Sequence, residues 1–199
     1  RVADAVKSYG VRGLLVKDES RPTIRKQRFR ASGKTMLRVS HLRSHDVSRE
    51  NINEMLHYLV RAIDNVDVVI FSDFNYGCLP QTFVDKVIDV CLRRKLPFLA
   101  DSQASSQVGD VSRFKDSLCL CATEREARLA LNDFKSGLQS VIERLSETSR
   151  AKNLIVKLGA EGLIAMSKNQ YRKTDSLRAL NSNPSDVAGA GDALLATTS

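Results

Sequence analysis

The hydrophobic residues of this chain recur with two different periods, and the two periods alternate along the sequence. Between residues 52 and 63 apolar side chains are three or four positions apart, which is the spacing of one helix face, and Ser48 is a candidate N-cap. Continuous apolar runs at 68–71 and 97–100 are typical of strands covered on both faces of a parallel sheet. The alternation continues with helices expected from Pro80 and over 123–131 and 137–145, and with strands over 117–121 and 154–158.

Strands that alternate with helices at such short spacing favour right-handed crossovers and an open, mostly parallel sheet covered by helices. The predicted fold class is therefore α/β. A short helix over residues 1–9, closed by Gly10, and a short strand over 13–17 are expected to precede this pattern.

Two pairs of segments have the loose alternation of antiparallel hairpins. Residues 23–30 and 35–42 flank the turn residues Ser32, Gly33 and Lys34, and this segment is too polar for a core element. Residues 163–166 and 170–174 predict a second hairpin at the edge of the sheet, joined by residues 167–169.

The formal net charge of +8 comes from a single segment. Between Ser20 and His45 there are eight basic residues and no acidic one, whereas the rest of the chain has 23 of each. Such a strip points to nucleic acid or to a phosphorylated small molecule, or it is a solvated surface. The chain has no tryptophan, and Phe29 is the only phenylalanine or tyrosine in the basic segment. Few side chains could therefore stack on the bases of single-stranded nucleic acid. We therefore expect no nucleic-acid partner.

Other features exclude several classes of protein. No apolar run reaches the roughly 18 residues that cross a bilayer, and the first residues do not have the pattern of a signal peptide, so we expect no membrane partner. The four cysteines form no C-x-x-C pair, which argues against a zinc ribbon or a thioredoxin-like site, and they are interpreted as buried thiols in a reducing cytoplasm. Because the chain starts at Arg1 and stops inside an apolar run, we expect a fragment of a longer protein.

Three predicted strands end in residues that suit a ligand site. Asp73, Asp101 and Gly159 each follow an apolar run, and ligands of open α/β sheets gather beyond the carboxyl ends of the strands. Each of these residues could instead form a turn or cap a helix.

The glycine-rich turn at residues 186–192 carries the most chemistry. Its small residues from Ala188 to Gly191 let backbone N–H groups approach a ligand, and the apolar run that follows predicts a helix whose N-terminus would bind an anion. An acid beside such a site suits a base for a hydroxyl that attacks phosphorus. Alternatives are a tight helix start or half of a dinucleotide fingerprint, although the third glycine of that fingerprint is missing. No P-loop sequence occurs.

Residues 186–192 resemble the signature D-[ST]-x-G-A-G-D of the ribokinase-like (PfkB) carbohydrate kinases. Residues 158–162 are similar to the family's L-G-x-x-G turn, and residues 123–126 lie where the family has N-x-x-E. Further upstream, residues 23–28, 36–39 and 72–74 are most similar to the kinase domain of heptose-7-phosphate kinase/ADP-heptose synthase proteins. The resemblance implies a three-layer α/β/α fold in one incomplete kinase domain, residues 1–199, with a lid hairpin at about 21–43 and a nucleotide and catalytic region at about 117–199.

The resemblance also implies the roles of individual residues at the catalytic turn. Asp192 would deprotonate the acceptor hydroxyl, while Gly189, Ala190 and Gly191 would donate N–H groups to the transferred phosphoryl group. Mg²⁺ would bridge the phosphates of ATP and be organised by Glu126 through water. The resemblance places Asp186 near a site for a monovalent cation such as K⁺.

Further roles concern the nucleotide and the substrate. Lys157, Gly159 and Gly162 would lie along the nucleotide, with Thr123 at the asparagine position of N-x-x-E. The substrate residues implied by the resemblance are Lys26, Arg28 and Asp73, of which the first two are candidates for a substrate phosphate.

The predicted function is ATP-dependent phosphorylation of a hydroxyl on a small-molecule sugar or sugar phosphate, and a homodimer is compatible with the resemblance. Four residues depart from the pattern of the heptose kinases: Thr123, Ala188, Tyr76 and Gln103. They support the alternative of a non-catalytic kinase-fold module that binds a nucleotide or sugar phosphate, for regulation or fused to a nucleotidyltransferase.

Overall fold

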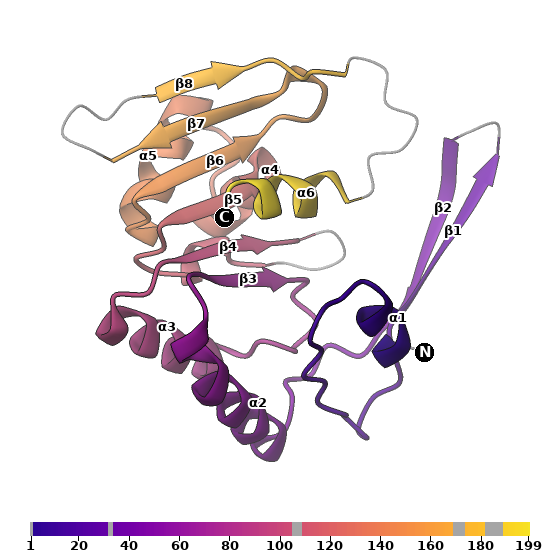
Figure 1. Cartoon of the computed structure of the whole chain (residues 1–199). Helices are drawn as coiled ribbons and strands as arrows, with labels where there is room; N and C mark the ends of the chain where they lie inside the picture. Colours follow the sequence, from indigo (N-terminus) through magenta and orange to yellow (C-terminus); the bar gives the residue numbers. More distant parts are fainter. Residues whose placement is uncertain (1, 32–33, 105–108, 169–173, 182–188) are drawn as a thin grey trace.

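The computed structural model of the chain describes residues 2–31, 34–104, 109–168, 174–181 and 189–199. Their main element is a six-stranded sheet in which sequential strands are neighbours (Figure 1). The first four strands are parallel and the last two are antiparallel, which confirms the mostly parallel α/β fold and the type of the edge hairpin. The strands are β3 (Val69–Asp73), β4 (Phe98–Ser102), β5 (Cys119–Thr123), β6 (Asn153–Lys157), β7 (Leu163–Ser167) and β8 (Thr174–Leu177).

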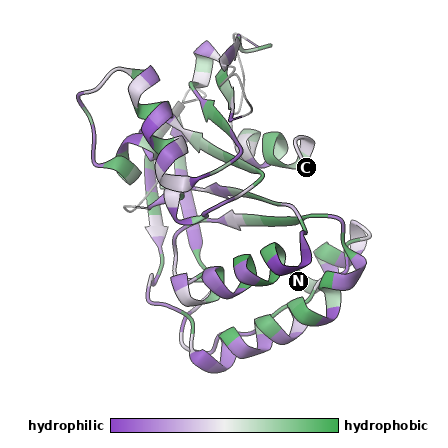
Figure 2. Ribbon diagram, turned by 90° about the vertical axis from the view of Figure 1, so that its left-hand side faces the viewer, coloured by the Kyte–Doolittle hydropathy of each residue, from purple (hydrophilic) through white to green (hydrophobic). Residues whose placement is uncertain are grey.

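Helices cover both faces of this sheet, but unequally. The large hydrophobic cluster contains fully buried side chains such as Val84 of α3, Ala127 of α4 and Leu145 of α5. On the other face, Leu195 of α6 packs on Leu99 and the thiols of β5, and Figure 2 shows α6 by itself on that side. The helices are α1 (Val2–Ser8), α2 (Arg49–Ala62), α3 (Gln81–Arg94), α4 (Glu124–Leu131), α5 (Leu138–Ser149) and α6 (Ala190–Thr197), with short 3₁₀ turns η1 (Ile63–Asn65), η2 (Val111–Arg113) and η3 (Gly159–Glu161).

The sequence-predicted elements between residues 48 and 167 agree with the structure to within a few residues. The hydroxyl of Ser48 accepts a hydrogen bond from the N–H of Asn51, which confirms it as the N-cap of α2. Pro80 is the N-cap residue of α3. The period of the apolar residues is thus sufficient to place this part of the fold.

The basic hairpin consists of β1 (Arg25–Ala31) and β2 (Lys34–His41) and extends away from the sheet (Figure 1). Its base is held by Arg21, whose guanidinium donates hydrogen bonds to the carbonyl oxygens of Tyr76 at 2.6 Å and Gly77 at 3.5 Å and forms an ion pair with Asp18 at 2.5 Å. The N–H of Val47 also donates to the Gly77 carbonyl, at 3.0 Å. The turn after β3 therefore anchors the hairpin to the sheet.

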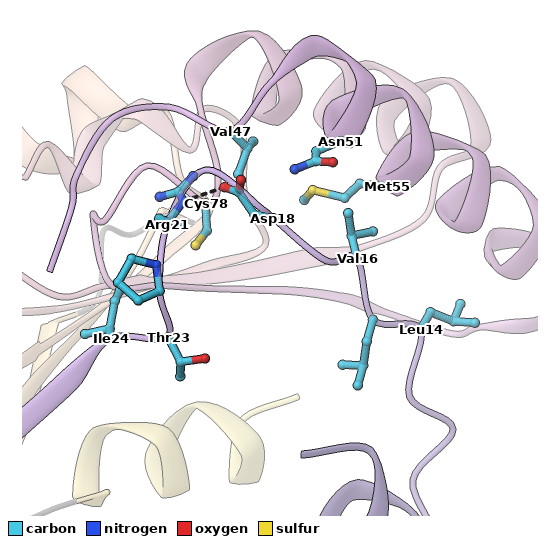
Figure 3. A pocket seen from close by; sticks show the side chains of 12 residues that line it. Leu14, Val16, Asp18, Arg21, Thr23, Ile24, Val47, Asn51, Met55 and Cys78 are labelled. Carbon is cyan, nitrogen blue, oxygen red and sulfur yellow. Dashed lines mark hydrogen bonds and ion pairs between the residues drawn. The ribbon is translucent and has the colours of Figure 1, made fainter. Parts of the chain in front are cut away.

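Two sequence-based predictions are wrong. Residues 13–17 do not form a strand: no strand of the described residues pairs with them, and they lie beside α2, where Leu14, Val16 and Met55 line a cavity of about 420 Å³ (Figure 3). Of the second strand of the edge hairpin, predicted over 170–174, Thr174 is described and belongs to β8 (Thr174–Leu177), while residues 169–173 lie outside the described part of the chain. Cys78 is exposed, whereas the other three thiols are buried as predicted.

Among the helices in the described ranges, none combines the length and the apolar character that a membrane-spanning segment needs.

We expect Gly77→Ala to destabilise the base of the hairpin by more than backbone strain alone. Gly77 has a φ of 76°, and a Cβ at this position would lie 2.2 Å from the carbonyl oxygen of His45. The strain of the left-handed conformation costs about 1–2 kcal/mol, and the collision should add about 1–3 kcal/mol. Urea unfolding measures the sum.

Gly10→Ala is the matched control, since Gly10 has a φ of 71° but no atom within 4 Å of the point that a Cβ would occupy. If the two variants lose the same stability, the close approach to His45 does not contribute.

Candidate active site

The carboxyl ends of β3 to β6 form one edge of the sheet, and the alternation of side chains distributes their polar residues to opposite faces. Asp73 is in register with Ser102, and Ser72 with Asp101. The Asp73 carboxylate therefore lies on the face that carries α3, where Ser102 donates a hydrogen bond to it at 3.2 Å. Asp101 points to the opposite face, which α6 covers. The two strand-end aspartates belong to separate parts of the site.

Asp101 forms a buried ion pair with Lys157 at the end of β6. The ammonium Nζ lies 3.1 Å and 2.9 Å from the two carboxylate oxygens, and the side chains are 18% (Lys157) and 3% (Asp101) exposed. Burial raises the pKa of the Asp101 carboxyl, the Lys157 ammonium opposes this shift, and the carboxylates of Glu126 and Asp192 raise the pKa further. The pair thus joins the ends of β4 and β6 and interacts electrostatically with the first turns of α4 and α6.

The glycine-rich turn enters α6 directly beside this pair. Gly189 is the N-cap residue with a φ of 82°, and the N–H of Ala193 donates to its carbonyl at 2.9 Å. Ala190 and Gly191 begin the helix, and the exposed Asp192 lies in its first turn. The first N–H groups of a helix have no partner within it, so this turn presents donors and a carboxylate together.

Three residues of the predicted turn, Asp186, Val187 and Ala188, lie outside the described residues. The first of them is the predicted neighbour of a monovalent cation.

Glu126 has a clear structural role at the start of α4. Its Oε2 accepts a hydrogen bond from the N–H of Thr123 at 2.7 Å, while the Thr123 hydroxyl accepts one from the N–H of Glu126 at 3.2 Å. This is a capping box. Its Oε1 accepts a further hydrogen bond from the N–H of Ala104 at 3.0 Å. Each carboxylate oxygen still has a lone pair for another donor or a metal-bound water.

The predicted nucleotide turn follows Lys157 on the same edge of the sheet. Thr123 is in register with Lys157, so the start of α4 and the end of β6 are neighbours. Gly159 begins the 3₁₀ turn η3 and is exposed, and the carbonyl of Gly162 accepts a hydrogen bond from the N–H of Leu158 at 2.8 Å. The hydrogen bond between Leu158 and Gly162 therefore closes the turn, and Gly159 on its outer side is exposed to solvent.

On the opposite face, Asp73 is held in a network that the sequence analysis missed. Arg113 forms an ion pair with it at 2.8 Å and also donates to the carbonyl of Leu79, and the N–H of Asn75 donates to its Oδ1 at 3.0 Å. Asp73, Asn75 and Arg113 line a polar cavity of about 330 Å³ that also reaches Ser44 and Asp46 at the base of the hairpin. Asp73 fixes the turn after β3, and its contact with a substrate stays a prediction.

Lys26 approaches the same turn from the hairpin. Its ammonium lies 4.7 Å from the ring centroid of Phe74 and 4.9 Å from that of Tyr76, and these two rings stack on each other. Arg28 is exposed two positions further along β1, opposite Arg38. Lys26 and Arg28 thus project from the same face of the strand.

Within the described ranges, no three histidine, cysteine or acidic side chains are close enough together to enclose a metal ion. Mg²⁺ does not require such a cage, because it keeps several waters and is usually bound through one or two carboxylates plus the phosphates of a nucleotide. The remaining lone pairs of Glu126 and the exposed carboxylate of Asp192 fit this mode of binding.

Comparison with known protein families gives a match over nearly the whole chain. The sequence profile described as "pfkB family carbohydrate kinase" matches residues 4–197. Among curated proteins, the bifunctional protein HldE of Desulfatibacillum aliphaticivorans is 26% identical over 187 residues, and that of Geobacter sulfurreducens is 28% identical over 186 residues. Each alignment covers 92% of this chain but only 37% and 36% of the relative, so the chain spans little more than a third of their length.

Solved structures agree on the fold. The tetrameric inhibited form of phosphofructokinase-2 from Escherichia coli superposes with a TM-score of 0.75 at 11% identity, covering 98% of this chain and 63% of the other. Ribokinase from Giardia lamblia gives a TM-score of 0.74 at 17% identity, with coverages of 98% and 59%. At these identities the likeness concerns the fold.

We expect Glu126→Ala to lower the free energy of unfolding by about 1–3 kcal/mol, because the N–H groups of Thr123 and Ala104 lose their acceptor inside the protein. Urea unfolding measures this loss. Glu124→Ala, which removes a partly exposed ion pair with Arg128 in the same helix, is the control and should cost less than about 1 kcal/mol. If the two variants lose the same free energy of unfolding, the buried hydrogen bonds of Glu126 do not stabilise the protein more than the exposed ion pair does.

Proposed function

This chain belongs to the pfkB family of carbohydrate kinases, and on that premise we propose that it transfers the γ-phosphoryl group of ATP to a hydroxyl of a sugar or sugar phosphate. The observation that carries the proposal is the first turn of α6, where helix N–H groups and the Asp192 carboxylate lie beside the Asp101–Lys157 pair. Phosphoryl transfer depends on positioning and charge stabilisation, which such a turn supplies.

In the proposed reaction the hydroxyl oxygen of the acceptor attacks the γ-phosphorus of ATP. The hydroxyl proton passes to the carboxylate of Asp192, and the bond between the γ-phosphorus and the bridging oxygen breaks, so that ADP leaves. The N–H groups of Gly189, Ala190 and Gly191 would stabilise the charge on the transferred group. Asp192 is exposed and therefore accessible to an acceptor hydroxyl.

The nucleotide is proposed to lie along Thr123, Gly159 and Gly162, at the carboxyl edge of β5 and β6. Mg²⁺, when bound with ATP, would neutralise charge on the β- and γ-phosphates, and Glu126 would hold one of its waters. Asp186 remains the proposed neighbour of a monovalent cation, and one similar structure is that of phosphofructokinase-2 from Escherichia coli in complex with potassium. ATP as the donor would place this reaction in the cytoplasm.

The acceptor is proposed to lie between the lid hairpin and the turn after β3, within the domain plan of a lid at about 21–43 and a catalytic region at about 117–199. The polar cavity beside Asp73 supports this location, as does the cationic face of β1. The HldE relatives make heptose phosphates the first compounds to test. The departures at Tyr76 and Gln103 are the reason to include other sugars and sugar phosphates.

We expect Asp192→Asn in the complete protein to lower kcat for sugar-dependent ADP formation by about 10²–10⁴-fold, because the base is removed. ATP binding should persist, since the N–H groups of the turn remain. A coupled ADP assay over a panel of sugars and sugar phosphates measures turnover, and calorimetry measures ATP binding.

Asp89→Asn is the control, because Asp89 forms an exposed ion pair with Arg93 on α3 and should not affect turnover. Full activity of Asp192→Asn would contradict the assignment of the base. If the wild-type protein releases no ADP with any compound of the panel, it is a non-catalytic binding module instead.

The lid residues yield a separate prediction. Arg28→Ala should raise KM for a phosphorylated acceptor by about 10- to 100-fold, the loss of one charge-assisted hydrogen bond, and leave KM for an unphosphorylated sugar unchanged. Lys26→Ala should have the same selectivity and also loosen the hairpin, because Lys26 contacts Phe74 and Tyr76. Arg93→Ala is the control. An unchanged KM for every phosphorylated compound would mean that the strip is a solvated surface.

A further inference from the structure

Lys157 contacts a carboxylate in the structure, although the resemblance assigns it to the nucleotide. Its ammonium donates hydrogen bonds to both carboxylate oxygens of Asp101, at 3.1 Å and 2.9 Å. The pair crosses β5, which lies between β4 and β6 in the sheet. Beneath it lies Cys121, which is in register with Asp101 and fully buried in the apolar cluster that includes Leu195 of α6. The ion pair therefore packs against the apolar cluster that lies between the sheet and α6.

The first turn of α6 rests directly on this pair. A Cβ placed on Gly191 would lie 3.1 Å from Nζ of Lys157 and 3.3 Å from Oδ2 of Asp101. Distances this short are tighter than ordinary Cβ contacts, so a side chain here would displace its neighbours by a few tenths of an ångström, and the backbone of the turn lies close against the ion pair. We therefore expect a change in the pair to alter the packing of the turn that carries Asp192.

Charge makes the ammonium necessary at this place. Asp101 interacts electrostatically with the carboxylates of Glu126 and Asp192, and Lys157 is the cation that opposes them. Without the ammonium, a buried carboxylate would lie uncompensated beside the first turn of α6, which is costly. Its repulsion would act on Asp192, the exposed member of the three.

We propose that Lys157 is a positioning residue: through Asp101 it seats the first turn of α6 and thereby places Asp192 for proton transfer, and it is not a ligand of the nucleotide. The catalytic part of this inference rests on the proposed kinase activity. The structural part, that the ion pair holds α6, can be tested without any substrate.

The experiment compares Lys157→Met and Lys157→Arg in the complete protein, with Lys17→Met as the control for an exposed ion pair. Hydrogen exchange of the peptide covering residues 190–199 is followed in the unliganded protein, and kcat and KM for ATP are measured separately. We expect Lys157→Met to speed exchange in α6 and to lower kcat about tenfold or more while KM for ATP changes less than about threefold. Lys157→Arg keeps the positive charge, so its hydrogen exchange in α6 and its kcat should both be close to those of the wild-type protein.

The double variant Asp101→Asn/Lys157→Met keeps the test decisive if Lys157→Met folds poorly, because it leaves no uncompensated charge. Hydrogen exchange in α6 should be slower in this double variant than in Lys157→Met. A large rise in KM for ATP with kcat and α6 exchange unchanged would overturn the proposal and make Lys157 a nucleotide ligand. If the wild-type protein has no kinase activity, the proposed function fails, and exchange in α6 still decides whether the ion pair holds the helix.

Discussion

Side chains along a β-strand alternate between the two faces of the sheet, and at the carboxyl edge of β3 to β6 this constraint decides which polar groups can meet. Asp73 and Asp101 lie at the carboxyl ends of neighbouring strands, yet one faces the α3 layer and the other faces α6. A shift of one residue in either strand would exchange their surroundings. The register therefore assigns the two aspartates to opposite faces of the sheet.

Each of these aspartates is buried, and each is compensated by a cation from a distant part of the sequence. Arg113 comes from the η2 turn before β5, and Lys157 from the end of β6. Burying a carboxylate without such a partner costs several kcal/mol per ion. The two cations are therefore requirements of the fold as much as of a site, and they tie the loops at the edge of the sheet to each other.

The sequence pattern was sufficient for the elements that bury an apolar face and insufficient where pairing depends on distant residues. The period of the apolar residues placed α2 and the strands β3 to β6 because their burial is regular. The apolar run at 13–17 has the composition of a strand, but a strand needs a neighbour, and local composition contains no information about one.

The same distinction applies to the candidate site. The glycine-rich turn was noticed from its small residues and residues 123–126 from their similarity to N-x-x-E, because both patterns are local in the sequence; the structure adds that Thr123 and Glu126 form a capping box. Asp101 was noticed as a strand end, whereas its partner Lys157 and the partner of Asp73, Arg113, were not recognised as such. They lie 56 and 40 residues from those aspartates, and only the order of strands in the sheet brings them together.

The hairpin β1–β2 has a further consequence for how such a protein can change over evolutionary time. None of its described residues belongs to either hydrophobic cluster, and it joins the rest of the molecule at a narrow base held by Arg21. Substitutions in β1 and β2 therefore alter the charge and shape of the surface with little effect on the hydrophobic core. In the proposed kinase, in which the hairpin contacts the acceptor, selectivity can diverge on the hairpin while selection for stability acts on other residues, so related chains can acquire new acceptors without redesigning the sheet.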